Sequence, residues 1–134
     1  MEKKFKKEIK SLDEIFDFIV EFVKLNRLDD SMTFTINLAI EELFTNMVKY
    51  NVESINDISI SLNKSDNNLK LVITDFDVEP FDITKSEDIN TGQSLEHRKI
   101  GGLGIQLVKR MVDKIYYEYR NRRSKITLIK ELGS

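Results

Sequence analysis

The chain has 134 residues, of which 40% are hydrophobic and 33% charged, and its net charge at pH 7 is −2. That length suits one domain with a real core, and the small net charge gives no electrostatic reason to expect nucleic acid as a partner. The lack of cysteine excludes disulfides and thiolate chemistry, and the single histidine excludes a metal site of several histidines. With no signal-peptide pattern and no apolar run of membrane-spanning length, we expect a cytoplasmic protein without membrane contact.

The first half of the chain predicts a strand, two helices and a hairpin. We interpret its basic start, with Lys3, Lys4, Lys6 and Lys7, as the solvated face of an edge strand. Ser11 and Glu14 have the spacing of a capping box at the start of the first helix. Hydrophobic spacing then predicts helices over 11–25 and 31–50, followed by paired strands over 58–62 and 69–75.

The second half predicts a long loop, a helix and two strands. Residues 75–100 lack periodicity and hold the only proline, Pro80, so we expect a functional lid over about 80–100. A glycine-rich turn at 101–104 then precedes an amphipathic helix to about residue 115, and strands follow over 115–120 and 126–129. This order predicts a single domain, 1–134, with an α/β (α+β) two-layer sandwich: a mixed, mostly antiparallel sheet with helices on one face.

Glu42 and Asn46 are the first candidates for chemistry. They lie four residues apart in the second predicted helix, so both side chains project from one side of it. A carboxylate near a phosphate pocket can act as a general base, and an amide oxygen can ligate Mg²⁺. Taken alone, the pair is more simply interpreted as two solvated polar residues.

Two further segments could complete a nucleotide site. Asp75 ends an apolar strand and could accept a hydrogen bond from an exocyclic amine such as that of adenine, although a turn residue is the simpler interpretation. The glycine-rich turn allows close backbone approach, and the helix after it offers unpaired N–H groups to an anion. A ligand-free loop fits that turn equally well, and the sequence contains no Walker P-loop.

In combination, these segments resemble the Bergerat-fold ATPases of the GHKL superfamily. The matching segments are ELFTN at 42–46, Asp75 with PFD at 80–82, and RKIGGLGIQLV at 98–108. Within the superfamily, the chain is most similar over nearly its whole length to the small anti-sigma-factor serine kinases of partner-switching systems. The resemblance implies a Bergerat ATP-binding fold with ATP and Mg²⁺ as cofactors.

The resemblance also implies roles for individual residues. Glu42 would be the catalytic base, Asn46 the Mg²⁺ ligand, and Asp75 the acceptor for the adenine amino group. The remaining nucleotide contacts would come from Lys99, Gly101, Gly102, Leu103, Gly104 and, near the adenine, Thr127. The implied activity is a serine/threonine kinase that phosphorylates an anti-sigma-factor antagonist, with a sigma factor and a homodimer left open as further interactions.

One departure from the family pattern leaves an alternative function open. The first glycine box usually reads Asp-x-Gly, but Asp77 stands in place of the glycine, and the run to Pro80 is one residue longer. A catalytically inactive ATP-binding module, or a nucleotide-free partner-binding module, therefore competes with the kinase. A histidine-kinase fragment is less favoured, because no phosphoacceptor helix precedes the domain and His97 falls in the predicted lid.

Overall fold

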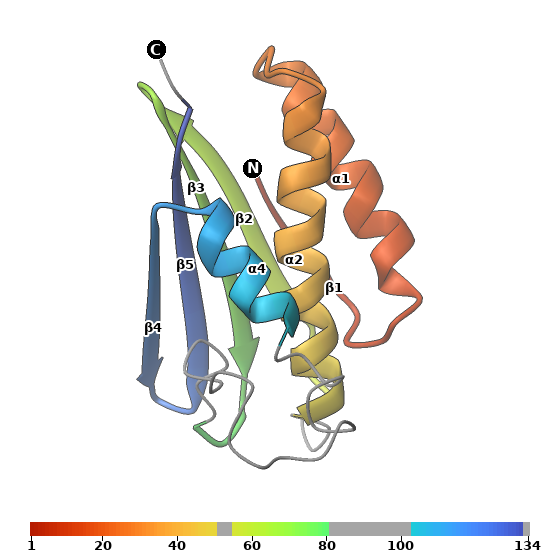
Figure 1. Ribbon diagram of the computed structural model, residues 1–134. Coiled ribbons are helices and arrows are strands. Elements are labelled where there is room, and N and C mark those ends of the chain that lie inside the picture. Colours follow the sequence, from red (N-terminus) through yellow and green to blue (C-terminus); the bar gives the residue numbers. More distant parts are fainter. Residues whose placement is uncertain (51–54, 81–102, 133–134) are drawn as a thin grey trace.

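The computed structural model describes residues 1–50, 55–80 and 103–132. The elements of this part are β1 (Glu2–Phe5), α1 (Ser11–Leu25), α2 (Ser31–Tyr50), β2 (Ile58–Ser65), β3 (Asn68–Phe76), α4 (Leu103–Met111), β4 (Lys114–Arg120) and β5 (Arg123–Glu131). The strands form one sheet in the order β1-β2-β3-β5-β4, and the helices cover one of its faces (Figure 1). The α+β sandwich is thus confirmed. All neighbouring strands in the described sheet are antiparallel, whereas the sequence pattern predicts a mixed sheet.

The hydrophobic core fills the space between the sheet and the helices. Apolar residues recur every three or four positions on the helices and every second position on the strands, so each element presents one apolar side to the core. The fully buried side chains include Ile15, Ile19, Phe22, Ile36, Ile40, Phe44, Met47, Ile60, Leu62, Ile105, Val108, Ile126 and Leu128. Their burial is the main stabilising contribution to the fold.

One predicted helix cap and one predicted helix end are wrong. The capping box is not formed: Lys10 is the N-cap of α1, and the Ser11 hydroxyl instead donates to the backbone oxygen of Lys6 at 2.7 Å. The helix expected to reach residue 115 ends at Met111, and Ile115 belongs to β4.

At the start of α2, the Ser31 N–H donates to the Asp29 carboxylate at 2.8 Å, and this bond lowers the pKa of Asp29.

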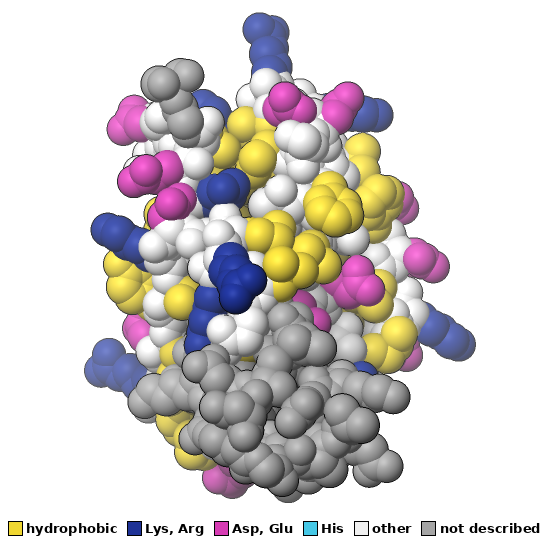
Figure 2. All heavy atoms as spheres, viewed as in Figure 1, with side chains coloured by type: hydrophobic (Ala, Val, Ile, Leu, Met, Phe, Trp, Pro, Cys, Tyr) yellow, Lys and Arg dark blue, Asp and Glu magenta, His cyan; other side chains and the backbone are white. Residues whose placement is uncertain are grey.

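The surface of the helix layer mixes apolar and charged side chains. Figure 2 shows hydrophobic side chains gathered in the middle of this face, with lysine or arginine side chains beside them. Exposed apolar residues of this layer include Phe34 on α2 and Leu107 on α4. None of the helices in the described part of the chain combines the length and the hydrophobicity that a membrane span requires.

Candidate functional site

The elements that carry the predicted site residues meet at one end of the molecule. The C-terminal ends of α2 and β3 and the beginning of α4 all lie at this end, together with the connection between β1 and α1 (Figure 1). Helix α2 packs against both α4 and β3. The fold therefore brings to one end the helix that carries Glu42 and Asn46 and the strand that ends near Asp75.

Glu42 and Asn46 contact each other directly. The Asn46 side chain is buried, and its Nδ2 donates to the backbone oxygen of Glu42 at 2.8 Å and to Oε1 of Glu42 at 3.1 Å. Because the amide nitrogen serves these two acceptors, the amide oxygen is the atom of Asn46 suited to a hard cation. This orientation fits the Mg²⁺ role that the family resemblance implies for Asn46.

The environment of Glu42 suits a proton acceptor of increased basicity. Its side chain is half-buried, and this burial raises the pKa of the Glu42 carboxyl. The hydrogen bond from Asn46 and the charge of Lys49 act in the opposite direction but do not cancel the effect of burial. A carboxylate with a raised pKa takes a proton from a hydroxyl more readily than an ordinary glutamate does.

Asp75 is fully buried and paired with a residue that the sequence pattern assigns to a solvated surface. The Nζ of Lys7 lies 2.9 Å from Oδ1 and 3.0 Å from Oδ2 of Asp75. The side chain of Lys7 is only 4% exposed, so the interpretation of this lysine as solvated is wrong. The two residues are 68 positions apart, and no local sequence signal connects them.

Thr127 does not lie beside Asp75. In the antiparallel register Asp75 pairs with Ser124, whereas Thr127 pairs with Val72. Directly paired residues point to the same face of a sheet, and residues three apart on one strand point to opposite faces. Ser124 therefore shares the helix-covered face with Asp75, and Thr127 lies on the open face.

Ser124 is a site candidate that the sequence interpretation missed. Its side chain is 2% exposed, and its hydroxyl has no hydrogen-bond partner within the described residues. Most buried hydroxyls in proteins are paired, so an unpaired one calls for a reason. Its position opposite Asp75 could have identified it. Predicting that position from sequence requires knowing exactly where the β4–β5 turn lies.

Asp77 adopts the backbone conformation for which a glycine is normally chosen. Its φ is 56°, in the left-handed region that glycine enters without steric cost and aspartate tolerates better than most residues. Its carboxylate accepts a hydrogen bond at 2.8 Å from Nε of Arg122, and Glu79 accepts one at 3.0 Å from the same guanidinium. The substitution therefore preserves the left-handed turn, and Arg122 compensates the added charge.

Two hydrogen bonds hold the same loop to the β4–β5 hairpin. The N–H of Val78 donates to the backbone oxygen of Arg122 at 3.0 Å. The hydroxyl of Tyr119 donates to the backbone oxygen of Val78 at 2.6 Å. The segment just after Asp75 is thus fixed to the neighbouring hairpin through both the N–H and the carbonyl oxygen of Val78.

The predicted phosphate-binding segment lies mostly outside the described residues. This applies to Lys99, Gly101, Gly102 and the predicted lid beyond Pro80. Leu103 and Gly104 form the first residues of α4, so a helix does begin at the glycine-rich turn. The roles of these residues stay predictions.

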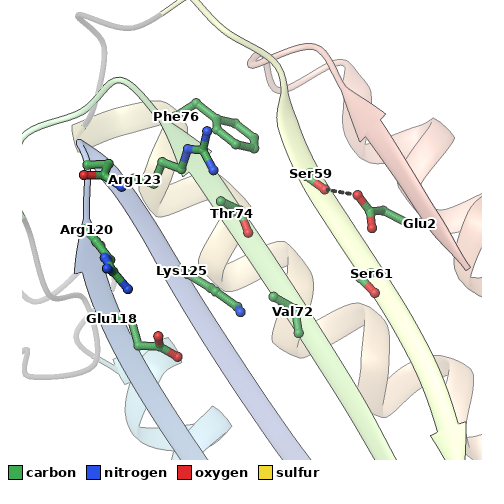
Figure 3. A pocket seen from close by; sticks show the side chains of 11 residues that line it. Glu2, Ser59, Ser61, Val72, Thr74, Phe76, Glu118, Arg120, Arg123 and Lys125 are labelled. Atoms are coloured by element: carbon green, nitrogen blue, oxygen red, sulfur yellow. Dashed lines mark hydrogen bonds between the residues drawn. The ribbon is translucent and has the colours of Figure 1, made fainter.

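A separate hollow lies on the open face of the sheet. Figure 3 shows its lining side chains, which project from strands β1 to β5. Its volume is about 460 Å³, and its lining includes Arg120, Arg123 and Lys125, together with Glu2 and Glu118. Because the sheet separates this hollow from Asp75, it forms no part of the site built from Glu42, Asn46 and Asp75.

Comparisons with known proteins agree with the observed fold. A family model described as a histidine kinase-like ATPase domain matches residues 5–130. No curated protein sequence matches the chain. A chain in the crystal structure of the SiaB-SiaC complex from Pseudomonas aeruginosa is similar with a TM-score of 0.67 and 8% identity, over 96% of this chain and 88% of that one. The Acinetobacter baumannii histidine kinase AdeS is similar with a TM-score of 0.53 and 16% identity, over 100% of this chain and 68% of that one.

Proposed function

Because the chain belongs to the histidine kinase-like ATPase domain family, we propose that it binds ATP with Mg²⁺ and transfers a phosphoryl group to a serine or threonine of a partner protein. The observation that carries the proposal is the direct contact of Glu42 with Asn46, at the same end of the fold as the buried Asp75. Phosphoryl transfer depends mainly on positioning and charge neutralisation, which a small set of residues can provide.

Each residue of the set has a role that its chemistry supports. The amide oxygen of Asn46 ligates Mg²⁺, which neutralises phosphate charge when bound. The Glu42 carboxylate accepts the proton of the attacking hydroxyl. Asp75 accepts a hydrogen bond from the adenine amino group, and the Ser124 hydroxyl supports this contact from the neighbouring strand.

We propose an anti-sigma-factor antagonist as the phosphorylated partner, in line with the family resemblance. The similar fold in the SiaB-SiaC complex supports this, because there a domain of this architecture was solved in a complex. A sigma factor and a second copy of the chain would be further partners. A binding module without kinase activity is the second candidate, favoured by the engagement of Asp75 with Lys7.

Glu42→Gln tests the kinase directly. With labelled ATP, Mg²⁺ and the cognate antagonist, the wild type is expected to form phosphoserine or phosphothreonine, and the variant to be slower by about 10²–10⁴-fold because it has no general base. ADP affinity should stay close to that of the wild type. The matched control is Glu41→Gln, an exposed neighbour on the same helix, which should retain full activity. Undiminished transfer by Glu42→Gln would rule out the kinase mechanism.

Glu42→Gln, which is expected to lower kinase activity, is expected to raise the stability of the folded protein at neutral pH. Burial raises the pKa of Glu42 above its unfolded value, so the folded protein favours the protonated carboxyl. Glu42 therefore contributes stability at low pH that is lost as the pH rises through its folded-state pKa. Glu42→Gln should thus unfold at a higher temperature than the wild type at pH 7, and the difference should shrink as the pH is lowered below the ordinary glutamate range.

Ser124→Ala separates a nucleotide contact from a structural one. Because the Ser124 hydroxyl has no partner in the described part of the chain, its removal should leave the free energy of unfolding unchanged or raise it by up to about 1 kcal/mol. Titration calorimetry should show ADP binding weakened by about three- to tenfold. Thr127→Val, on the opposite face, is the control and should not change ADP affinity. Equal affinity in both variants would remove Ser124 from the site.

A further inference from the structure

The proposed function assigns the Asp75 carboxylate to recognition of adenine. In the structure this carboxylate already forms an ion pair with Lys7. Lys7 Nζ lies within 3.0 Å of both Asp75 oxygens, and the side chains are 4% and 0% exposed. Two charges withdrawn from water to this extent depend on each other for stability. A hydrogen bond between ionised groups is also stronger than one from a neutral amine, such as the amino group of adenine.

The backbone on both sides of Lys7 is held by contacts, so rotation of the Lys7 side chain is the simplest way for its ammonium to leave Asp75. Strand β1 ends at Phe5, whose ring packs edge-on against Phe18 with 5.5 Å between the ring centroids. Beyond Lys7, the N–H of Glu8 and the hydroxyl of Ser11 both donate to the backbone oxygen of Lys6, at 2.8 Å and 2.7 Å. The lysine stem, by contrast, has several rotatable bonds that can carry the ammonium away from the carboxylate.

We propose that Lys7 is an internal competitor of the nucleotide base, and that a nucleotide binds only when the Lys7 ammonium gives up Asp75. The proposal rests on the proposed nucleotide site. The adenine amino group and the Lys7 ammonium are both donors, and Asp75 is the acceptor that they share. The observed affinity for nucleotide is therefore lower than the intrinsic affinity, by the fraction of molecules in which Lys7 is displaced.

Lys7→Met tests the competition by removing the ammonium while keeping an unbranched side chain. Calorimetric titration of the full chain with ADP and Mg²⁺ should show binding at least about tenfold tighter than that of the wild type. The preference for ADP over IDP, which has a carbonyl in place of the amino group, should also increase. Lys6→Met is the matched control, since Lys6 is the exposed neighbour, and it should bind ADP like the wild type.

A second measurement uses the wild type and does not depend on the folding of the variant. Amine acylation followed by mass spectrometry should label Lys7 slowly without nucleotide, with the exposed Lys70 as internal reference. Saturating ADP and Mg²⁺ should accelerate labelling of Lys7 at least several-fold and leave Lys70 unchanged.

The outcomes distinguish failure of this inference from failure of the proposed function. If the wild type binds ADP, Lys7 stays protected at saturation and Lys7→Met binds no tighter, competition by Lys7 is refuted and the nucleotide site stands. If only Lys7→Met binds ADP, the competition is supported and the wild type is no kinase under those conditions. If ADP binds to neither protein, both the nucleotide site and the competition are refuted.

Discussion

Asp75→Asn is expected to lower the free energy of unfolding by about 3–5 kcal/mol, because it leaves the Lys7 ammonium buried without its charge partner. Such a loss is a large fraction of the stability of an ordinary domain. Urea denaturation followed by circular dichroism measures it. The matched control is Asp66→Asn, in an exposed turn where φ is 53°, a conformation that asparagine also tolerates. That substitution should change stability by no more than about 0.5 kcal/mol.

A double variant separates loss of the pair from loss of packing. Replacing both charged residues, in Lys7→Met with Asp75→Leu, leaves no uncompensated charge and should recover most of the stability lost in Asp75→Asn, since apolar residues often replace buried ion pairs without cost. If Asp75→Asn were no less stable than Asp66→Asn, the ion pair would contribute nothing to the folded state.

Phe44→Ala is expected to destabilise the protein by about 3–5 kcal/mol, through lost burial and the cavity left behind. The Phe44 side chain is fully buried and lies on α2 between Glu42 and Asn46 in the sequence. Phe34→Ala on the same helix is the control, because Phe34 is 70% exposed and its loss should change stability by no more than about 0.5 kcal/mol. Denaturant midpoints of the two variants give the comparison, and equal midpoints would contradict the packing of α2 against the sheet.

The elements of the fold could be predicted because their signals are local. Hydrophobic spacing predicts helices over 11–25 and 31–50, and the structure confirms both as α1 and α2. Alternation predicts the β2–β3 hairpin and the final pair of strands in the same way. The predicted capping box failed because Lys10, and not Ser11, is the N-cap of α1, so the Ser11 oxygen is not at the position from which a capping side chain accepts.

The parts of the site that the sequence could not place depend on information that is not local. The burial of Lys7 depends on a partner 68 residues away. The choice between Thr127 and Ser124 depends on the β4–β5 turn, which has two residues, Asn121 and Arg122, both with positive φ. A polar turn over 121–124 leaves the register undefined, and a shift of one residue moves every side chain to the other face of the sheet.

Two kinds of contact link the loop at Asp77 to the β4–β5 hairpin, and they differ in their sensitivity to ionic strength. The pairs of Arg122 with Asp77 and Glu79 are exposed, and dissolved salt screens such pairs. The bonds of Val78 to Arg122 and Tyr119 are between neutral groups and are hardly screened. Concentrated salt would therefore loosen the carboxylates around this turn, while the backbone of Val78 stays in place. A glycine at position 77 would provide the left-handed turn but would leave Glu79 as the only one of these two carboxylates to pair with Arg122.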